Sequence, residues 1–521
     1  MISRESRPSF GAKCSCHWAS QRTGRAFFGA AALWWALFEP GFAGPGATSS
    51  ANKDALGPPA VAPQDSILAE YTPQAPPNPS PPPYTLLRFN EDYSYLADPA
   101  RRTDPFDAVK YIPLSTDDAL SYLSLGADLR ERYENFTYPG FGASPNPSRT
   151  HDLLQRIDID ADLHFNEHFR LFTQVISGYD WGGNTPAPPV DQDPAALQQA
   201  FLDFRIDNKS ASDPEYLVVR AGRFAMTYGS GRLIATRQAP NIPFKFDGLE
   251  IIGAAHDAKF YAFLTNPARE KKTAFDDDFP HQLLGGVYAT TPLLSSALDL
   301  RADLYYLYYQ NHSVHYANGT GPEVRNTFGT RLFGKVNGFD YDIEPIIQTG
   351  NFAGREIFAW TVGSTVGYRF EESPLKPRLG ADFDVVSGDS GGTGHFGTFN
   401  PLFFKSGYFD DASLIRPSNI IDIHPTLQLQ AAHALLVTLG SDLIWRYTRR
   451  DGIYGPPGNL ELPAGGQGRY LATTAEASVQ WQLSRHLSWI GSYTRFFTGS
   501  YVQSSKGHDV DFFGTWATFT F

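Results

Sequence analysis

Cysteine is almost absent from this 521-residue chain, and its two copies, Cys14 and Cys16, lie close to the N-terminus. Several basic residues precede an apolar run at 26–38, and residues 41–43 read Gly-Phe-Ala, a small-x-small cleavage site. This order is typical of an export signal peptide, so residues 1–43 are predicted to be removed. The mature chain would then have no disulfide, no thiol catalysis and no cysteine-based metal site.

Long apolar runs and an excess of positive charge are also missing. Beyond residue 43 no apolar stretch approaches the ~20 residues that a transmembrane helix requires, which excludes a helical membrane protein but not a transmembrane barrel. The formal net charge is -12, and removal of residues 1–43 leaves 38 basic against 53 acidic residues, or -15. This acidity argues against a nucleic-acid partner and against docking on an anionic membrane surface.

The segment after the predicted cleavage site is rich in Pro, Ala and Ser, and ends in APPNPSPPP. Such a composition cannot bury a core, so residues 44–83 are predicted to form a disordered, partly polyproline II linker in the periplasm. A docking motif within this linker is the alternative. Residues 84–120 have mixed polarity without a sustained period, and we expect an irregular periplasmic lip or short plug.

Phenylalanine and tyrosine are abundant, with 39 and 26 copies against 2 of methionine, which favours strands. From residue 121 to 521 apolar and polar residues alternate, most clearly at 123–134, 156–165 and 378–385. This period of two predicts strands. Many exceed the ~9–11 residues of a bilayer crossing, and their polar faces carry charges that a water-filled lumen permits. A soluble antiparallel sheet packed on a second sheet is the alternative.

Connections between the predicted strands alternate in length. Short turns lie at 166–168, 336–338 and 483–485, and long loops at 182–196, 311–323, 387–414 and 449–468. Predicted strands start near residues 121, 152, 169, 197, 215, 246, 257, 282, 297, 325, 339, 356, 377, 418, 433, 469, 486 and 509. The sequence therefore predicts an all-β fold, a transmembrane antiparallel barrel of about eighteen strands over residues 121–521 in a bacterial outer membrane, in contact with lipid and lipopolysaccharide.

The last predicted strand alternates Phe513, Ala517, Phe519 and Phe521 with polar or small residues. A final strand that ends in Phe resembles the signal read by the barrel-assembly machinery of outer-membrane proteins. We therefore expect that machinery as a partner. A soluble edge strand that ends in Phe is the alternative.

Eight short segments follow one another in an order and spacing that resemble a known family. They are FNEDYSYL at 89–96, KYIPL at 110–114, YLSLGADLRERYE at 122–134, QAFLDFRI at 199–206, RAGRFAMTYGSGRLI at 220–234, FDGLEI at 246–251, SGD at 387–389 and TFNPLF at 398–403. From about Leu87 to Phe521 the chain resembles the bacterial alginate-export outer-membrane barrels. The resemblance implies an eighteen-stranded monomer whose lumen, lined by arginines and acids, passes an anionic polysaccharide, with periplasmic secretion components as further partners.

A basic, glycine-rich stretch at 220–248 stands out from the acidic chain and predicts a site for an anion. It has no acidic residue before Asp247. Arg220 and Arg223 cannot share one face of a regular strand, so a β-bulge is predicted at Gly222. The candidate arginines of this stretch are Arg220, Arg223, Arg232 and Arg237.

The alternation places further charged residues on the predicted lumen face. These are Arg130, Arg132, Arg156, Arg205, Arg301 and Arg331, with Asp128, Asp158, Asp160, Asp203, Asp299 and Asp303 as acidic partners. A guanidinium fork matches a carboxylate, and repeated weak sites let a polyanion move without being trapped. Scaffold ion pairs in a general porin without saccharide selectivity are the alternative.

Other functions receive less support from the sequence. An outer-membrane hydrolase is an alternative, but neither a GxSxG elbow nor an HExxH motif is present, so no enzyme is expected. No cofactor or metal is expected either, because the acidic loops at 275–279 and 389–392 lack the full ligand spacing of a calcium loop and are predicted to be solvated. A gated, energy-coupled receptor would require a large folded plug, for which residues 44–120 are too few.

Overall fold

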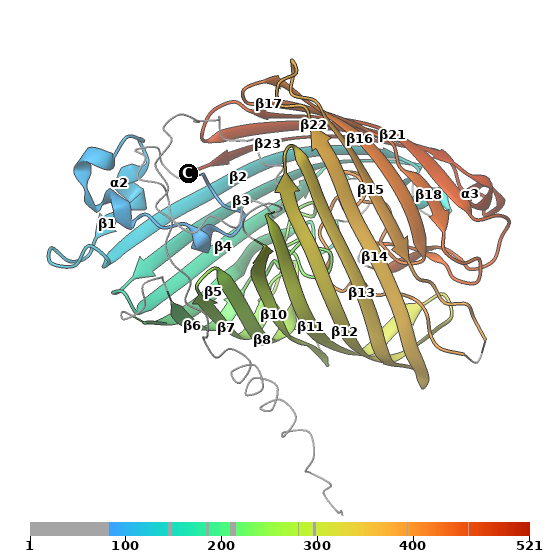
Figure 1. Cartoon of the computed structure of the whole chain (residues 1–521), viewed down its shortest axis with the longest axis horizontal. Coiled ribbons are helices and arrows are strands. Elements are labelled where there is room, and N and C mark those ends of the chain that lie inside the picture. The colour runs from blue at the N-terminus through green and yellow to red at the C-terminus, as the bar shows by residue number, and fades with distance from the viewer. Residues whose placement is uncertain are drawn as a thin grey trace, which may run out of the picture. The chain divides into compact units, whose positions relative to one another are not determined.

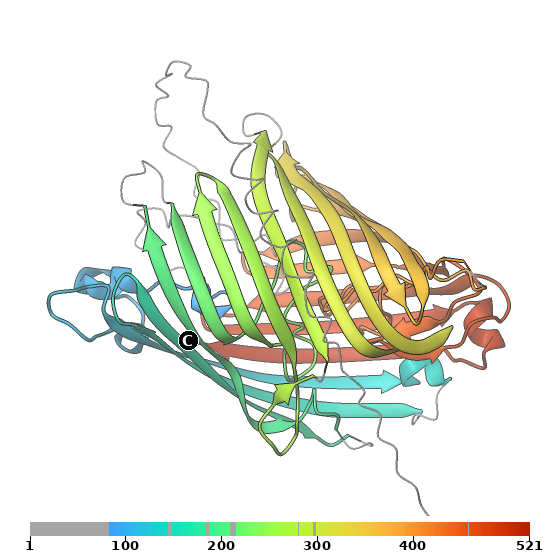
Figure 2. The ribbon, with the colours of Figure 1, turned by 90° about the horizontal axis from the view of Figure 1, so that it is seen from below.

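In the computed structural model the described residues are 83–143, 148–183, 187–208, 215–279, 281–294, 299–392, 394–456 and 458–521. The predicted signal peptide at 1–43, and the predicted linker at 44–83 apart from Pro83, lie outside them. None of the described helices is long and apolar enough to cross a membrane. The described residues form mostly strands, which lie side by side all the way round (Figures 1 and 2).

The strands form a closed antiparallel barrel, because β2 (Tyr122–Thr137) pairs both with β3 (Arg149–His164) and with the last strand, β23 (Val510–Thr520). Its main sheet has 21 strands. Two of them, β1 (Ile112–Pro113) and β9 (Asp277–Asp278), are short additions to the sheet. Two others are the halves of one interrupted wall strand, so the barrel wall has eighteen strands. The interrupted wall strand consists of β17 (Leu435–Gly440) and β18 (Leu443–Arg446).

The remaining elements complete the wall and its connections. The other wall strands are β4 (Phe169–Trp181), β5 (Asp193–Asp207), β6 (Tyr216–Phe224), β7 (Phe246–Ala255), β8 (Ala258–Arg269), β10 (Gln282–Leu294), β11 (Leu300–Tyr316), β12 (Gly319–Val336), β13 (Phe339–Phe352), β14 (Arg355–Arg369), β15 (Arg378–Val386), β16 (Ile420–Ala432), β21 (Tyr470–Gln482) and β22 (Leu487–Thr498). The short elements are β1 (Ile112–Pro113), β9 (Asp277–Asp278), β19 (Ile453–Gly455), β20 (Asn459–Leu462), α2 (Asp107–Lys110), α3 (Ser500–Ser504), η2 (Arg88–Asn90), η3 (Ser94–Ala97), η4 (Pro99–Arg101) and η5 (Pro139–Gly142).

The predicted strand starts agree with these wall strands, with the largest difference at β12, which begins at Gly319 and not near 325. The predicted long loop at 311–323 is wrong, because β11 and β12 continue through it and pair up to Tyr316 and Gly319. Polar residues occupy both faces of this stretch, so the sequence carries no apolar alternation there that would have indicated strands.

The wall turns its polar face inward and its apolar face outward. On β2, Arg130 and Arg132 are each 4% exposed, whereas the alternating Leu129 and Tyr133 are 41% and 37% exposed. Outward side chains such as Ile159 are apolar and exposed along the strands. This is the pattern of a barrel surrounded by lipid, and it is the reverse of a soluble sheet.

The segment predicted as a lip or short plug lies beside the C-terminus, at the end of the barrel where β2 begins (Figures 1 and 2). Arg88 donates to the carboxylate of Asp128 at 3.1 Å and to the carbonyl oxygen of Phe521 at 2.8 Å. The ring of Phe89 packs against Phe172 and Phe201, with ring centroids 5.7 and 5.2 Å apart. The segment therefore contacts both the rim and the inner wall.

Gly222 does not form the predicted bulge, since β6 pairs with β5 and β7 without a register shift. Its φ of 136° lies in the region that favours glycine, and a Cβ there would lie 2.9 Å from the Cα of Phe201. Glycine thus lets the chain keep its register where two strands approach closely.

Gly222→Ala is expected to destabilise the barrel by about 1–3 kcal/mol, since alanine would have to adopt a strained backbone conformation. Urea unfolding of the refolded protein, followed by tryptophan fluorescence, measures this change. Gly394→Ala is the control, because its new Cβ would have no heavy atom within 4 Å. Equal unfolding midpoints for both variants and the wild type would contradict the expectation.

Lys110, at the end of α2, is a buried cation in the N-terminal segment. It is 2% exposed, and its Nζ lies 5.0 Å from the centroid of the Tyr93 ring and 5.8 Å from that of Phe521. Burial, and secondarily the charge of Arg88, lowers the pKa of Lys110 to about 8. When the segment detaches, this pKa returns to about 10.4.

Between these two pKa values the detached state holds more protons, so the docked segment becomes more stable as pH rises from about 8 to about 10. We expect proteolytic release of the segment to slow over this range in the wild type, relative to Lys110→Met, whose docking lacks this dependence. The ratio of the two rates at each pH cancels the protease's own pH profile. A ratio that does not change with pH would contradict the expectation.

Candidate functional site

The connection between β6 and β7, residues 225–245, crosses the interior of the barrel, and we call it the crossing loop. Its Arg232 donates from Nε to Glu344 on β13 at 3.1 Å and from Nη1 to Asp384 on β15 at 2.9 Å. These strands are not neighbours of β6 and β7, since four wall strands separate β13 from β7 and six separate β15 from β7. A loop that starts in one part of the wall is therefore fastened to another.

The returning half of the crossing loop is fastened to the strands β2 to β4. Arg130 donates to the carbonyl oxygen of Gln238 at 2.6 Å and to the side-chain oxygen of Asn241 at 3.2 Å. The amide of Asn241 donates to the carbonyl oxygens of Gln155 and Tyr179, each at 2.9 Å. The crossing loop thus bridges two separate parts of the inner wall.

A second connection, residues 387–419 between β15 and β16, lies against the crossing loop, and we call it the inner loop. Backbone hydrogen bonds of 2.8 Å join Phe403 to Leu233 and to Ala235. The ring of Phe403 packs edge-on against Phe244 of the crossing loop, at 5.3 Å, and against Tyr309 of the wall, at 5.9 Å. The two loops thus lie against each other and against the inner wall, and we call this part of the barrel interior the constriction.

Local sequence explains how the crossing loop turns into the lumen. Gly229 and Gly231 have φ of 57° and 70°, which glycine adopts at little cost. Just before them, Tyr228 stacks between wall residues, 5.3 Å from the Phe263 ring and 5.4 Å from that of Tyr288. The tyrosine fixes the start of the loop, and the glycines allow the sharp change of direction.

Eight of the ten predicted arginines have a carboxylate partner within 4.0 Å. Arg132 pairs with Glu134, Arg156 with Asp158, Arg205 with Asp207, Arg220 with Asp203 and Glu250, Arg223 with Asp247, Arg232 with Glu344 and Asp384, Arg301 with Asp299, and Arg331 with Asp303 and Asp342. Ion pairs of this kind neutralise most of the cationic lining.

Arg220 and Arg223 lie on opposite faces of β6. Arg220 is buried in the interior and binds Asp203 through two hydrogen bonds of 2.9 and 3.0 Å. Arg223 points away from that face, binds Asp247 at 2.6 and 2.7 Å, and lies 5.3 Å from the ring of Phe275. Because no bulge turns the strand, Arg223 does not join Arg220 in the lumen, contrary to the prediction.

The predicted acidic partners divide into three groups. Asp158, Asp203 and Asp303 pair with predicted arginines. Asp128 and Asp160 instead face Arg88 of the N-terminal segment, at 3.1 and 3.9 Å. Asp299 lies in the turn before β11 with its side chain 65% exposed, so it and Arg301, 4.0 Å away, are at the rim.

Arg130 and Arg237 differ from the other candidates, because no carboxylate oxygen of the described residues lies within 4.0 Å of either guanidinium. Arg237 lies 3.9 Å above the centroid of the Phe244 ring, and its buried Nε has no hydrogen-bond partner in the described part of the chain. Burial lowers the pKa of Arg237, against the opposing influence of Glu270 and Asp191. Since arginine stays protonated, its buried charge is incompletely compensated, and an anion beside it would be stabilised.

Residues 121–515 match the family model described as Alginate export. The chain belongs to the alginate export family. This family and the closed eighteen-stranded barrel with its apolar outer face place it in the bacterial outer membrane. No curated protein matches the chain.

Solved structures similar to this alginate export family member are outer-membrane porins of low sequence identity, so the likeness concerns the fold. A BenF-like porin from Pseudomonas fluorescens Pf-5 has a TM-score of 0.53 at 10% identity, covering 77% of this chain and 99% of the porin. The outer membrane protein opdK from Pseudomonas aeruginosa has a TM-score of 0.51 at 10% identity, covering 77% and 98%. OccD3 (OpdP) from the same organism has 0.51 at 11%, covering 77% and 91%.

Several buried charges of this family member were missed by the sequence reasoning. Arg325, 0% exposed, donates to Glu323 and Gln348, and it lies at the edge of the stretch wrongly predicted to be a loop. Glu344 and Asp384 belong to recognised alternating strands, but nothing in their local sequence indicates that a loop residue reaches them. Only the folded chain brings these charges together.

The two acidic loop segments are solvated only in part: Asp277 and Asp278 are exposed as predicted, whereas Asp276 and Asp389 are not. Asp276 is buried, with one carboxylate oxygen 2.7 Å from Nζ of Lys245. Asp389 is also buried and is held by Arg355 through two hydrogen bonds of 2.9 and 3.0 Å. Both carboxylates find their counter-charges within the folded loops and the adjoining wall.

Arg232→Met is expected to release the crossing loop from the far wall, because it leaves Glu344 and Asp384 without this cation at a cost of about 3–5 kcal/mol. In planar bilayers the released loop should raise both the mean conductance and the open-channel current noise. Arg205→Met is the control, since Arg205 lies half-exposed on β5, where its ion-pair partner is Asp207. Unchanged current noise in a folded Arg232→Met barrel would contradict this role.

Proposed function

We propose that this outer-membrane barrel conducts an anionic polysaccharide, or a related organic anion, through the constriction between the crossing loop and the inner loop. The observation that carries the proposal is a pair of buried guanidinium groups, those of Arg130 and Arg237, with no carboxylate partner among the described residues. Arg130 also fastens the crossing loop by bonding to Gln238, the residue next to Arg237. The incompletely compensated charge thus belongs to the constriction itself.

A polyanion carries a carboxylate on each sugar, and it must bind well enough to enter and weakly enough to leave. A guanidinium meets the first need, because its fork matches a carboxylate and stays charged at any relevant pH. Ion pairs such as that of Arg220 with Asp203 meet the second, since they keep the rest of the lining from binding the chain tightly. Selectivity would then rest on few residues and not on the whole arginine lining.

Two alternatives differ from this proposal in what they predict. In a general porin every lumen arginine serves only the scaffold, which describes the eight paired arginines well but leaves Arg237 unexplained. In a hydrolase a histidine would act as a base beside a nucleophile. The two ring nitrogens of His424 instead lie 3.2 and 3.3 Å from carboxylate oxygens of Asp442 and Glu476, so catalysis is not proposed.

The partners follow from the same proposal. We expect a monomer surrounded by lipid and lipopolysaccharide and inserted by the barrel-assembly machinery, because the apolar outer face is continuous along the strands. Periplasmic secretion components would deliver a polysaccharide to the end of the barrel where the N-terminal segment lies. No cofactor is required for such transport.

Planar-bilayer recordings under a salt gradient test the proposal. The wild type is expected to be anion-selective and to be blocked by uronate oligomers, because an anion binds beside Arg237. Arg237→Gln and Arg130→Gln should shift the reversal potential toward cation selectivity and weaken the block at least tenfold, a loss of about 1.4 kcal/mol. Arg205→Gln, at the rim, should change neither.

Cation selectivity in the wild type, or a block by uronate that Arg237→Gln leaves intact, would overturn the proposal. Arg237→Lys provides a further control, because it keeps the charge but loses the planar fork. It should preserve most of the anion selectivity while weakening the block. Loss of both properties in this variant would indicate damage to the loop and not loss of charge.

A further inference from the structure

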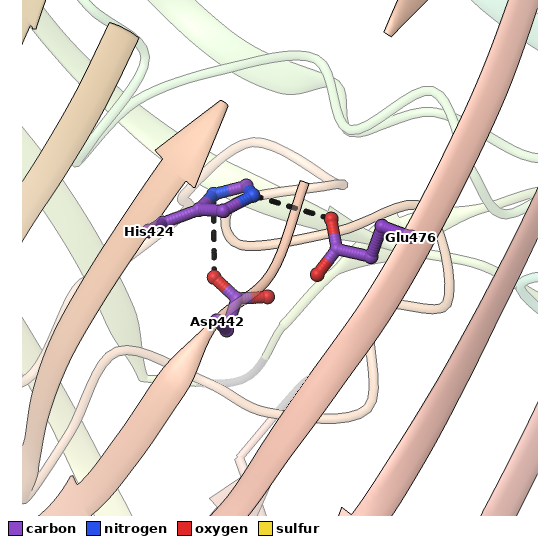
Figure 3. Close-up of side chains that lie close together, drawn as sticks. All are labelled: His424, Asp442 and Glu476. Atoms are coloured by element: carbon purple, nitrogen blue, oxygen red, sulfur yellow. Dashed lines mark ion pairs between the residues drawn. The ribbon is translucent and has the colours of Figure 1, made fainter. Parts of the chain in front are cut away.

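A second group of lumen side chains lies on the strands between β15 and β21. His424 on β16, Asp442 in the break between β17 and β18, and Glu476 on β21 converge on one point (Figure 3). One ligand atom from each residue lies within 4.8 Å of the other two. All three face the interior, and Asp442 is fully buried.

Both ring nitrogens of His424 face carboxylate oxygens. Nδ1 lies 3.2 Å from Oδ1 of Asp442, and Nε2 lies 3.3 Å from Oε2 of Glu476. A neutral imidazole carries only one N–H, so one of its nitrogens presents a lone pair to a carboxylate oxygen. Nε2 is buried and makes no hydrogen bond within the described chain. Repulsion between the two electron pairs is removed either by a second proton on the imidazole or by a metal ion between the two atoms.

An independent observation concerns Asp422, which precedes His424 on the same face of β16. Asp422 is 2% exposed, and neither of its carboxylate oxygens has a hydrogen-bond partner among the described residues. Asp382 adds a further carboxylate, 3.7 Å from Nδ1 of His424. One histidine thus faces four carboxylates, and buried charges of one sign require a counter-charge.

The wall is interrupted where these residues meet. Pro425 has no N–H, and it only accepts a hydrogen bond, of 3.3 Å, from Ser441 in the break between β17 and β18. Within the break, Asp442 is held through its backbone N–H, which donates to Oγ1 of Thr474 at 2.6 Å. A metal ion bound by His424, Asp442 and Glu476 would join three neighbouring wall strands at this gap.

We propose that His424, Asp442 and Glu476 bind a divalent transition-metal ion of the zinc class, with Asp422 available as a further carboxylate ligand. Imidazole nitrogen combined with carboxylate oxygens suits zinc, whereas calcium and magnesium prefer oxygen ligands alone. The interior position and the missing ladder bond at Pro425 point to a structural role in the wall. This site is independent of the anion path at Arg130 and Arg237.

The test uses untagged, full-length barrel, because a polyhistidine tag would bind the same metals. The protein is stripped with EDTA, incubated with Zn²⁺, Ca²⁺ or Mg²⁺ in separate samples, passed through a desalting column and assayed by elemental mass spectrometry. About one zinc per chain is expected, with little calcium or magnesium. Co²⁺ in place of zinc should give the visible absorption of a nitrogen- and oxygen-ligated ion.

His424→Gln and Glu476→Gln should each lower zinc affinity at least tenfold, and zinc should raise the thermal unfolding temperature of the wild type but not of these variants. His433→Gln, at the exposed turn after β16, is the control and should bind like the wild type. Heat-modifiable migration in gels confirms that each variant is folded.

Absence of stoichiometric zinc in the wild type would overturn the proposal, and so would equal retention by folded His424→Gln. Retention of calcium or magnesium in preference to zinc would overturn the assignment to the zinc class. Because anion selectivity is measured separately with Arg237→Gln, failure of the metal site leaves the proposed function unaffected, and failure of that function leaves the metal site standing.

Discussion

A charge that is buried between the loops and the wall of this barrel is removed from water, so a counter-charge within the barrel stabilises it strongly. Arg232 shows how far this constraint reaches. Its pairing with Glu344 and Asp384 carries the crossing loop over the interior and fastens it to strands that are distant along the wall. Arg130 fastens the returning half through neutral carbonyl and amide oxygens. The constriction depends on these two anchors.

The same constraint separates two kinds of arginine in this family member. Where a carboxylate lies opposite, as Asp203 does for Arg220, the charge is neutralised and the side chain supports the wall. Where none of the described carboxylates does, as for Arg237, we propose that the charge is available to a ligand. The cluster around His424 is the opposite case, since carboxylates outnumber cations there and a bound metal ion would balance their negative charge. The interior thus combines a cationic constriction with an anionic patch of wall.

The wall was predictable because residues along a barrel strand face lipid and lumen in turn, so apolar and polar residues alternate in the sequence. That local signal located all the wall strands and failed only at 311–323, where both faces are polar. The sequence contains no comparable signal for contacts between residues that are far apart along the chain. Arg232 is adjacent in sequence to no acid that it binds, and His424, Asp442 and Glu476 come from three strands. Which arginines stay unpaired is decided by contacts between distant segments.

The most direct test of the central claim is an experimental structure of the barrel with a bound uronate oligomer. The account predicts a carboxylate of the oligomer within hydrogen-bond distance of the Arg237 or Arg130 guanidinium, with the crossing loop still fastened at Arg232. An oligomer bound elsewhere in the lumen, with Arg237 paired to a carboxylate of the protein, would contradict it.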